Sequence, residues 1–359
     1  MKSRLLAVFL VFALALTLFP AAAQDMMDPC LGLSGADCEI VKAADAKLAE
    51  MTSFTLGFKF DLSLTGLESL SGLLGTTGEG APQALTVTAD AANSPLVINP
   101  TAADPMAAFA MAMDVNGSIT GTGTDDQSGT FSFVIVDGVF YAKDPETGQW
   151  MGGPLSEFLD SAGMAGLPVD PAALMEGDMG AMGAAADPTA LLAGSGLSPE
   201  DLAALMSVQG FTSQARLADA EMMGQKMYAF ESKVDFVPLL SSPEFQKVLT
   251  NLATASDDPD MAQVGQIGML LPMLLQEGNI KTTRWIGADD MWVHRLVLEA
   301  NVVVDLNAMM SMGGGAAGGD VPKMEPVVLR LLLDVELSAH NATAAPTAPE
   351  GAQMMEMGS

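Results

Sequence analysis

One stretch of strict alternation constrains this chain more than any other feature. Apolar side chains occupy every even position from Phe54 to Leu64, and the odd positions hold small or polar residues such as Lys59 and Asp61. Because successive side chains of a strand point to opposite faces, this pattern predicts a strand over 54–64 with one apolar and one hydrated face. The strand is longer than the usual five or six residues, and long strands of this kind are typical of a large antiparallel sheet.

The same alternation recurs along the chain, so that several strands share this character. Asp137-Gly138 separates two of these segments and is a strong hairpin signal. The alternating segments are 85–87, 109–115, 131–135, 139–143, 228–236, 292–306 and 327–337. We therefore predict an α+β fold built on a curved antiparallel sheet with one apolar face.

Helical spacing of apolar residues predicts helices at four places. Residues 39–51 form the first, with Asp37 as its N-cap. The other three are expected to cover the concave apolar face of the sheet, and Pro272 should bend the last of them. These three predicted helices are 154–162, 238–252 and 260–277.

The beginning of the chain has the features of a secretory signal peptide. Lys2 and Arg4 precede an apolar segment over 5–19, and small residues end at Ala23, where we expect cleavage. A retained membrane anchor is the alternative, but the segment is shorter than the ~20 residues that a span needs. No later segment is long and apolar enough to span a membrane.

The expected product is a free extracytoplasmic protein, either secreted or in the periplasm or cell envelope. The first cysteine, Cys30, does not follow the small-residue box of a lipid-anchored protein. We expect a signal peptide over 1–23 and a single domain over 24–340. A low-complexity insertion is expected at 163–196 and a disordered tail at 341–359.

The cysteines predict a disulfide and no cofactor. In an oxidising compartment, a close pair such as Cys30 and Cys38 usually forms a disulfide. Two cysteine ligands cannot close a tetrahedral metal site, and neither His294 nor His340 is near them in sequence.

Charge and motif content exclude two classes of function. A formal net charge of −29 does not fit nucleic-acid binding, which needs a basic surface. The chain has only two histidines, and it lacks a nucleophile elbow, a phosphate loop and a dinucleotide fingerprint. We predict that it is not an enzyme, that His294 is a packed histidine and that His340 is exposed.

The 27 methionines leave a copper-binding alternative open, since thioethers are soft ligands that favour Cu(I). The other interpretation is that methionine supplies adaptable apolar surface. The clusters, most of them in low-complexity segments, are 26–27, 175–182, 309–312 and 354–357.

The hairpin over 136–150 carries a family resemblance. Its sequence has the form DGxxYxKDPxTGxW, from Asp137-Gly138 through Lys143-Asp144-Pro145 to Trp150. This resembles the LppX/LprG group of bacterial lipoproteins and, more distantly, the LolA/LolB lipoprotein carriers. The resemblance implies a half-barrel sheet with helices across its concave side and acyl chains held between them. The missing lipobox cysteine and the insertion at 163–196 depart from that pattern.

These observations together predict a carrier that holds a lipid or another hydrophobic ligand between sheet and helices, without catalysis. An envelope protein is a further expected partner. The first alternative is an envelope scaffold or sensor with a filled core, and the second is the copper-binding protein. The predicted apolar lining residues are Phe54, Phe58, Phe60, Phe131, Phe133, Leu271 and Leu275.

Overall fold

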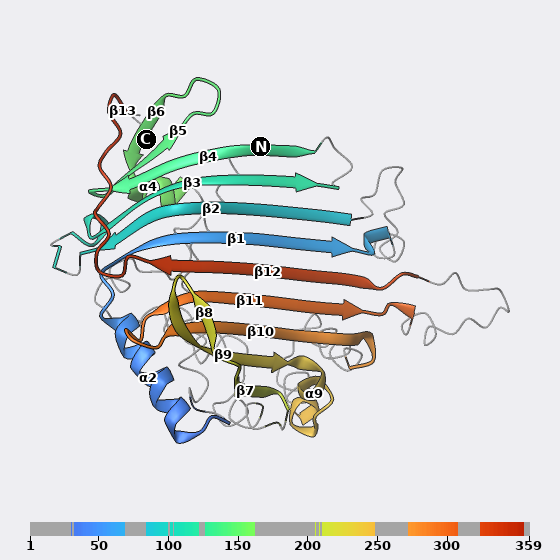
Figure 1. Ribbon diagram of the computed structural model, residues 1–359. Helices are drawn as coiled ribbons and strands as arrows, with labels where there is room; N and C mark the ends of the chain where they lie inside the picture. Colours follow the sequence, from blue (N-terminus) through green and yellow to red (C-terminus); the bar gives the residue numbers. More distant parts are fainter. Residues whose placement is uncertain are drawn as a thin grey trace.

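The computed structural model contains one large open sheet with helices packed on one of its faces (Figure 1). It describes residues 30, 32–68, 84–99, 101–102, 104–121, 126–161, 205, 208, 210–247, 272–307 and 324–354. The predicted signal peptide, the insertion at 163–196 and the glycine-rich segment at 309–320 lie outside these residues.

Thirteen strands of the described residues form this sheet. They are β1 (Ser53–Thr65), β2 (Ala84–Ile98), β3 (Phe109–Thr120), β4 (Gln127–Val136), β5 (Val139–Lys143), β6 (Trp150–Pro154), β7 (Thr212–Arg216), β8 (Ala220–Met222), β9 (Gln225–Asp235), β10 (Leu275–Gly287), β11 (Val293–Val304), β12 (Val327–Ser338) and β13 (Gln353–Met354). The helical elements are α2 (Gly35–Ala49), the 3-10 turn η1 (Pro105–Ala107), α4 (Leu155–Ser161) and α9 (Phe236–Leu240).

Two runs of consecutive antiparallel strands meet at the centre of the sheet. The strand order is β13-β6-β5-β4-β3-β2-β1-β12-β11-β10-β9-β7, and β8 pairs with β9 outside this path. The central neighbours β1 and β12 are antiparallel although most of the chain separates them, and Phe60 lies opposite Leu333. Figure 1 shows β1 in blue beside β12 in red. The predicted α+β fold with a curved, mostly antiparallel sheet is confirmed.

Registered pairs give the sheet two chemically different faces. Phe58 of β1 lies opposite Val335 of β12 and Ala91 of β2, and Lys59 lies opposite Asp334 and Asp90. Directly opposite residues of a sheet point to the same side. We call the side of Phe58 the inner face and the side of Lys59 the outer face.

The sequence indicates only a short strand here, because clear alternation is limited to Leu85 and Val87. Strand β2 is much longer. The strand continues to Ile98 through an irregularity opposite Gly57, where Asn93 has a positive φ of 54°. Asparagine tolerates this backbone conformation better than most residues. Hydrogen bonding to β1 and β3 on both sides outweighs the weak strand propensity of this segment.

Helix α2 begins earlier than predicted and has a different cap. Ser34 is its N-cap, and the Ser34 hydroxyl oxygen accepts a hydrogen bond from the Asp37 N–H at 3.2 Å. Asp37 therefore lies in the first turn, where a carboxylate favours the positive end of the helix dipole. The N-cap prediction is wrong because both residue types are good caps and the sequence does not show which one leaves the helix.

The other predicted helices are partly altered. The helix over 154–162 is confirmed as α4. Within 238–252, a helix begins at residue 243 after Ser242, whose hydroxyl oxygen accepts from the Phe245 N–H at 3.1 Å, whereas residues 238–240 belong to the separate α9. Residues 248–252 lie outside the described part. Of 260–277, only 272–277 are described: 272–274 are helical, whereas Leu275 already begins β10. Pairing of Leu275 with Val304 of β11 competes successfully with the helical pattern there.

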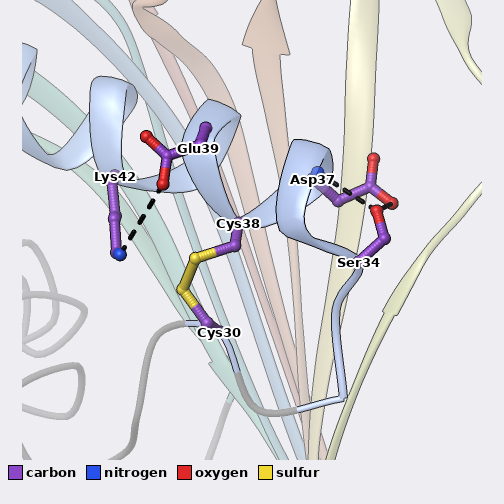
Figure 2. The surroundings of a disulfide bond; sticks show 6 residues. All are labelled: Cys30, Ser34, Asp37, Cys38, Glu39 and Lys42. Carbon is purple, nitrogen blue, oxygen red and sulfur yellow. Dashed lines mark hydrogen bonds and ion pairs between the residues drawn. A yellow bond between two sulfur atoms is a disulfide. The ribbon is translucent and has the colours of Figure 1, made fainter.

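The predicted disulfide is confirmed, since Cys30 and Cys38 are bonded with their Cα atoms 4.9 Å apart (Figure 2). Cys38 is buried in the second turn of α2. Figure 2 shows the bond on the flank of the helix, beside the Ser34–Asp37 cap. The bond therefore ties the segment before α2 to the helix, and it fits an oxidising compartment.

Removal of this disulfide is expected to lower the free energy of unfolding by about 2–3 kcal/mol, because the unfolded chain regains the entropy of a small loop. Urea denaturation of Cys30→Ser measures the loss. Reduction of the wild-type protein should give the same loss, and a reduced protein as stable as the oxidised one would contradict the expectation.

The segment after β12 follows a defined path, so the prediction of a disordered tail is wrong for residues 341–354. Asn341 Oδ1 accepts hydrogen bonds from Thr52 N at 2.7 Å and Ser53 N at 3.4 Å, and Asn341 Nδ2 donates to Glu50 O. The chain then runs along the strand ends in Figure 1 and adds β13 as a parallel partner of β6. Hydrogen bonds from side chains and backbone pairing hold this segment in place. It has no packed apolar face, and its sequence therefore shows no periodicity.

Candidate functional site: the apolar inner face of the sheet

Five of the seven predicted lining residues lie together on the inner face. Phe54, Phe58 and Phe60 of β1 and Phe133 of β4 are buried in one cluster, and Phe131 packs against it partly buried. Leu275 is partly buried at the start of β10 and belongs to a strand, not to a covering helix. Leu271 lies outside the described residues. The alternation of apolar and polar side chains along the strands thus predicted the inner face correctly. That these residues line a cavity stays a prediction.

Stacked rings continue the cluster toward one edge of the sheet. The ring centroids of Phe131 and Phe133 are 5.7 Å apart, and those of Phe133 and Phe140 are 5.9 Å apart. Phe140 of β5 then stacks on Phe158 of α4 at 4.1 Å. Such pairs add to simple area burial, so they fix α4 over the inner face at β4–β6.

Helix α2 covers the inner face at the opposite edge. Its fully buried Val41 and Ala44 pack against Phe230, Ile286 and Val293 of β9–β11. Matched apolar surfaces hold α2 on the sheet. The covering role was expected for the three later helices and not for this one, so the position of α2 on the inner face was not predicted.

Two ion pairs that sequence reasoning missed also connect α2 to the sheet. Arg216 of β7 donates to Asp37 at 2.5 Å, and Arg284 of β10 donates to Asp45 at 3.0 Å. Both arginines are on the inner face, because they pair across strands with Phe230. The Arg284 side chain is only 6% exposed, and its burial lowers the pKa of the guanidinium. The only feature of the sequence that could have indicated these ion pairs is the spacing of the two aspartates, eight residues apart on α2.

Between the two covering helices, the apolar surface extends beyond the buried cluster. On the central strands, the inner residues near the C-terminal end of β1 and the N-terminal end of β12 are apolar but only partly buried. Registered pairs place them side by side, as in Leu62 with Val87 and Leu331. We call this the central apolar patch, and it consists of Leu62, Leu64, Leu85, Val87, Ala300, Val302, Leu329 and Leu331.

The hairpin motif that carries the family resemblance has a structural role. Asp137 and Gly138 both have positive φ values, of 53° and 73°, as a tight two-residue hairpin turn requires. Asp144 accepts from the backbone N–H groups of Glu146 and Thr147, each at 2.8 Å. The Thr147 N–H bond is the main cause that lowers the pKa of Asp144. The polar groups of the motif thus shape two turns.

Both histidines are packed against other side chains. His294 is buried, and its Nε2 lies 3.0 Å from both Asp290 Oδ2 and Gln225 Nε2. His340 stacks on Trp292 with centroids 4.9 Å apart and is half-buried, so the prediction that it is exposed is wrong. Burial lowers the pKa of His340, which favours the neutral ring.

The described part of the chain offers no cluster of three His, Cys, Asp or Glu side chains that could hold a metal ion. Most of the methionine clusters lie outside it. Among its helices, none is long and apolar enough to cross a membrane.

Comparison with known proteins gives similarity to solved structures only. The chain matches no protein-family model and no curated protein. It is similar to LprF from Mycobacterium bovis, with 13% identity over 89% of this chain and 99% of that chain and a TM-score of 0.35. It is also similar to the lipoprotein LppX from Mycobacterium tuberculosis, with 11% identity over 85% and 95% of the two chains and a TM-score of 0.29.

A more remote similarity is to a putative outer membrane lipoprotein-sorting protein domain from Vibrio parahaemolyticus, with 7% identity over 86% and 93% of the chains and a TM-score of 0.18. At these TM-scores the similarities imply nothing about the ligand of this chain.

Proposed function

We propose that this protein binds a lipid or another hydrophobic ligand outside the cytoplasm and carries it non-covalently on the inner face of its sheet. The observation that supports the proposal most is the central apolar patch. Side chains such as Leu62 and Leu331 continue the inner face without a change in chemistry, yet they are only partly buried. A contiguous apolar patch that is left partly open is typical of a binding surface.

The energetics suit a carrier. Burying an acyl chain of about 16 carbons contributes roughly 13 kcal/mol at about 0.8 kcal/mol per methylene group. Association and ordering cost about 4–15 kcal/mol, so the net affinity is moderate and release is feasible. Binding of this kind needs no catalytic group, which fits the structural role of the hairpin motif.

Two adjacent leucines of β12 provide a matched test. Leu331 is on the inner face in the central apolar patch, and Leu332 is 41% exposed on the outer face. Leu331→Gln should weaken binding of the methyl ester of pyrene-decanoic acid at least tenfold, because it removes apolar contact and places an amide under the chain. Leu332→Gln should leave the affinity unchanged. Pyrene fluorescence titration measures both.

The thermal midpoint of each variant separates loss of binding from loss of folding. A wild-type protein that binds no acyl probe would refute the carrier proposal and favour the scaffold or sensor with a filled core. Equal weakening by the two substitutions would show that the probe does not bind at the inner face.

A further inference from the structure

A row of uncharged polar side chains interrupts the apolar inner face on β7, β9 and β10. Gln214 pairs with Ser232, and Ser232 pairs with Thr282. Neighbouring strands are about 4.8 Å apart, so the three side chains lie next to one another across the sheet. Thr282 in turn pairs with Leu298 of β11, where the inner face becomes apolar and continues to the central apolar patch.

The groups in this row are available for hydrogen bonding. All three side chains are half-buried, and none forms a side-chain hydrogen bond to another residue of the described part. Half-buried hydroxyl and amide groups that form no bond within the protein can exchange a hydrogen bond to water for one to a polar ligand atom. The rows on either side do not share this character: one holds Val234 and Ile280, and the other holds Phe230 and Arg284.

The charges around the row are balanced. Arg216 pairs with Asp37 at 2.5 Å, and Arg284 pairs with Asp45 at 3.0 Å. Lys226, farther along β9, pairs with Asp219 at 2.8 Å. These three cations are therefore each paired with an aspartate, and the whole chain carries a net charge of −29. A phosphate or carboxylate headgroup would find little net attraction here.

We infer that the row of Gln214, Ser232 and Thr282 binds the uncharged headgroup of an amphiphile that carries hydroxyl groups. This inference rests on the proposed function. The acyl chain of the ligand extends from Leu298 over the central apolar patch, and the headgroup receives hydrogen bonds from β7, β9 and β10. The protein thereby selects for neutral lipids over anionic ones with the same chain.

The test compares two cross-strand Ser/Thr pairs of the same sheet. Ser232→Ala/Thr282→Val removes two hydroxyl groups from the inner face and keeps the shape. Ser63→Ala/Thr86→Val makes the same changes in a directly opposed, partly buried pair on the outer face. Displacement of the pyrene-decanoic methyl ester is measured with 1-oleoylglycerol, methyl oleate and oleoyl-lysophosphatidic acid.

The wild-type protein should bind 1-oleoylglycerol more tightly than oleoyl-lysophosphatidic acid. The inner-face variant should lose about tenfold in affinity for 1-oleoylglycerol and none for methyl oleate, which lacks the hydroxyl groups. The outer-face variant should behave as wild type. Unchanged 1-oleoylglycerol affinity in the inner-face variant, or tighter binding of the anionic lipid, would overturn the inference and leave acyl binding intact. If the wild-type protein binds none of these lipids, the proposed function fails and the inference with it.

Discussion

Replacing Asp45 with alanine is expected to lower the free energy of unfolding by about 3 kcal/mol, because it removes the α2 carboxylate from a buried guanidinium. The Arg284 side chain is 6% exposed, and Arg284 Nη1 donates to Asp45 Oδ1 at 3.0 Å. Urea denaturation followed by circular dichroism measures the change.

A control on the same helix uses the exposed pair of Glu39 and Lys42, whose charged atoms are 3.8 Å apart. Glu39→Ala should leave the denaturation midpoint unchanged, since exposed pairs contribute little. The double variant Asp45→Ala/Arg284→Met should recover part of the lost stability, because it also removes the buried charge. If the double variant were less stable than Asp45→Ala alone, the desolvation argument would be wrong.

The second large effect is expected at Gly66, which follows β1 where the chain leaves the centre of the sheet. Its φ is +78°, and an added Cβ would collide with the carbonyl oxygen of Pro326 and lie 2.9 Å from the carbonyl carbon. Gly66→Ala should lower the free energy of unfolding by roughly 2–4 kcal/mol, through backbone strain and displacement of the segment that enters β12. Thermal and urea denaturation give the loss.

Gly129 of β4 is the matched glycine, because a Cβ added there would meet nothing within 4 Å and its φ is not in the left-handed region. Gly129→Ala should therefore keep the stability of the wild-type protein. Similar losses in the two variants would indicate a general sensitivity to glycine replacement and not a close approach of β1 to β12.

Much of the sheet could be predicted, because alternation of side chains is a local property. The runs at 54–64, 109–115 and 327–337 correspond to β1, β3 and β12 with the apolar residues on one face. Strands β7 and β8 were missed because residues such as Gln214 and Ser213 show no alternation of polar and apolar side chains. Their backbone pairs with β9, and this pairing does not depend on side-chain type.

The candidate site was predictable in part. Phe58, Phe60 and Phe133 were expected on the apolar face and lie there, since the period of a strand assigns each residue to a face. The assignment of Leu275 to a covering helix was wrong because helical and strand patterns overlap at the border of β10. The ion pairs of α2 with β7 and β10 join residues that are far apart in sequence, so no local sequence pattern predicts them.

By itself, the sequence determined the properties that depend on neighbouring residues. These are the apolar and polar side of each alternating strand, the tight turn at Asp137-Gly138 and the close cysteine pair that forms the disulfide. The tertiary structure alone decided that β1 lies beside β12, that the central apolar patch is left partly open, and that Gln214, Ser232 and Thr282 form one row. The physical reason is that strand order and register depend on pairing between distant segments, and burial depends on what packs over them.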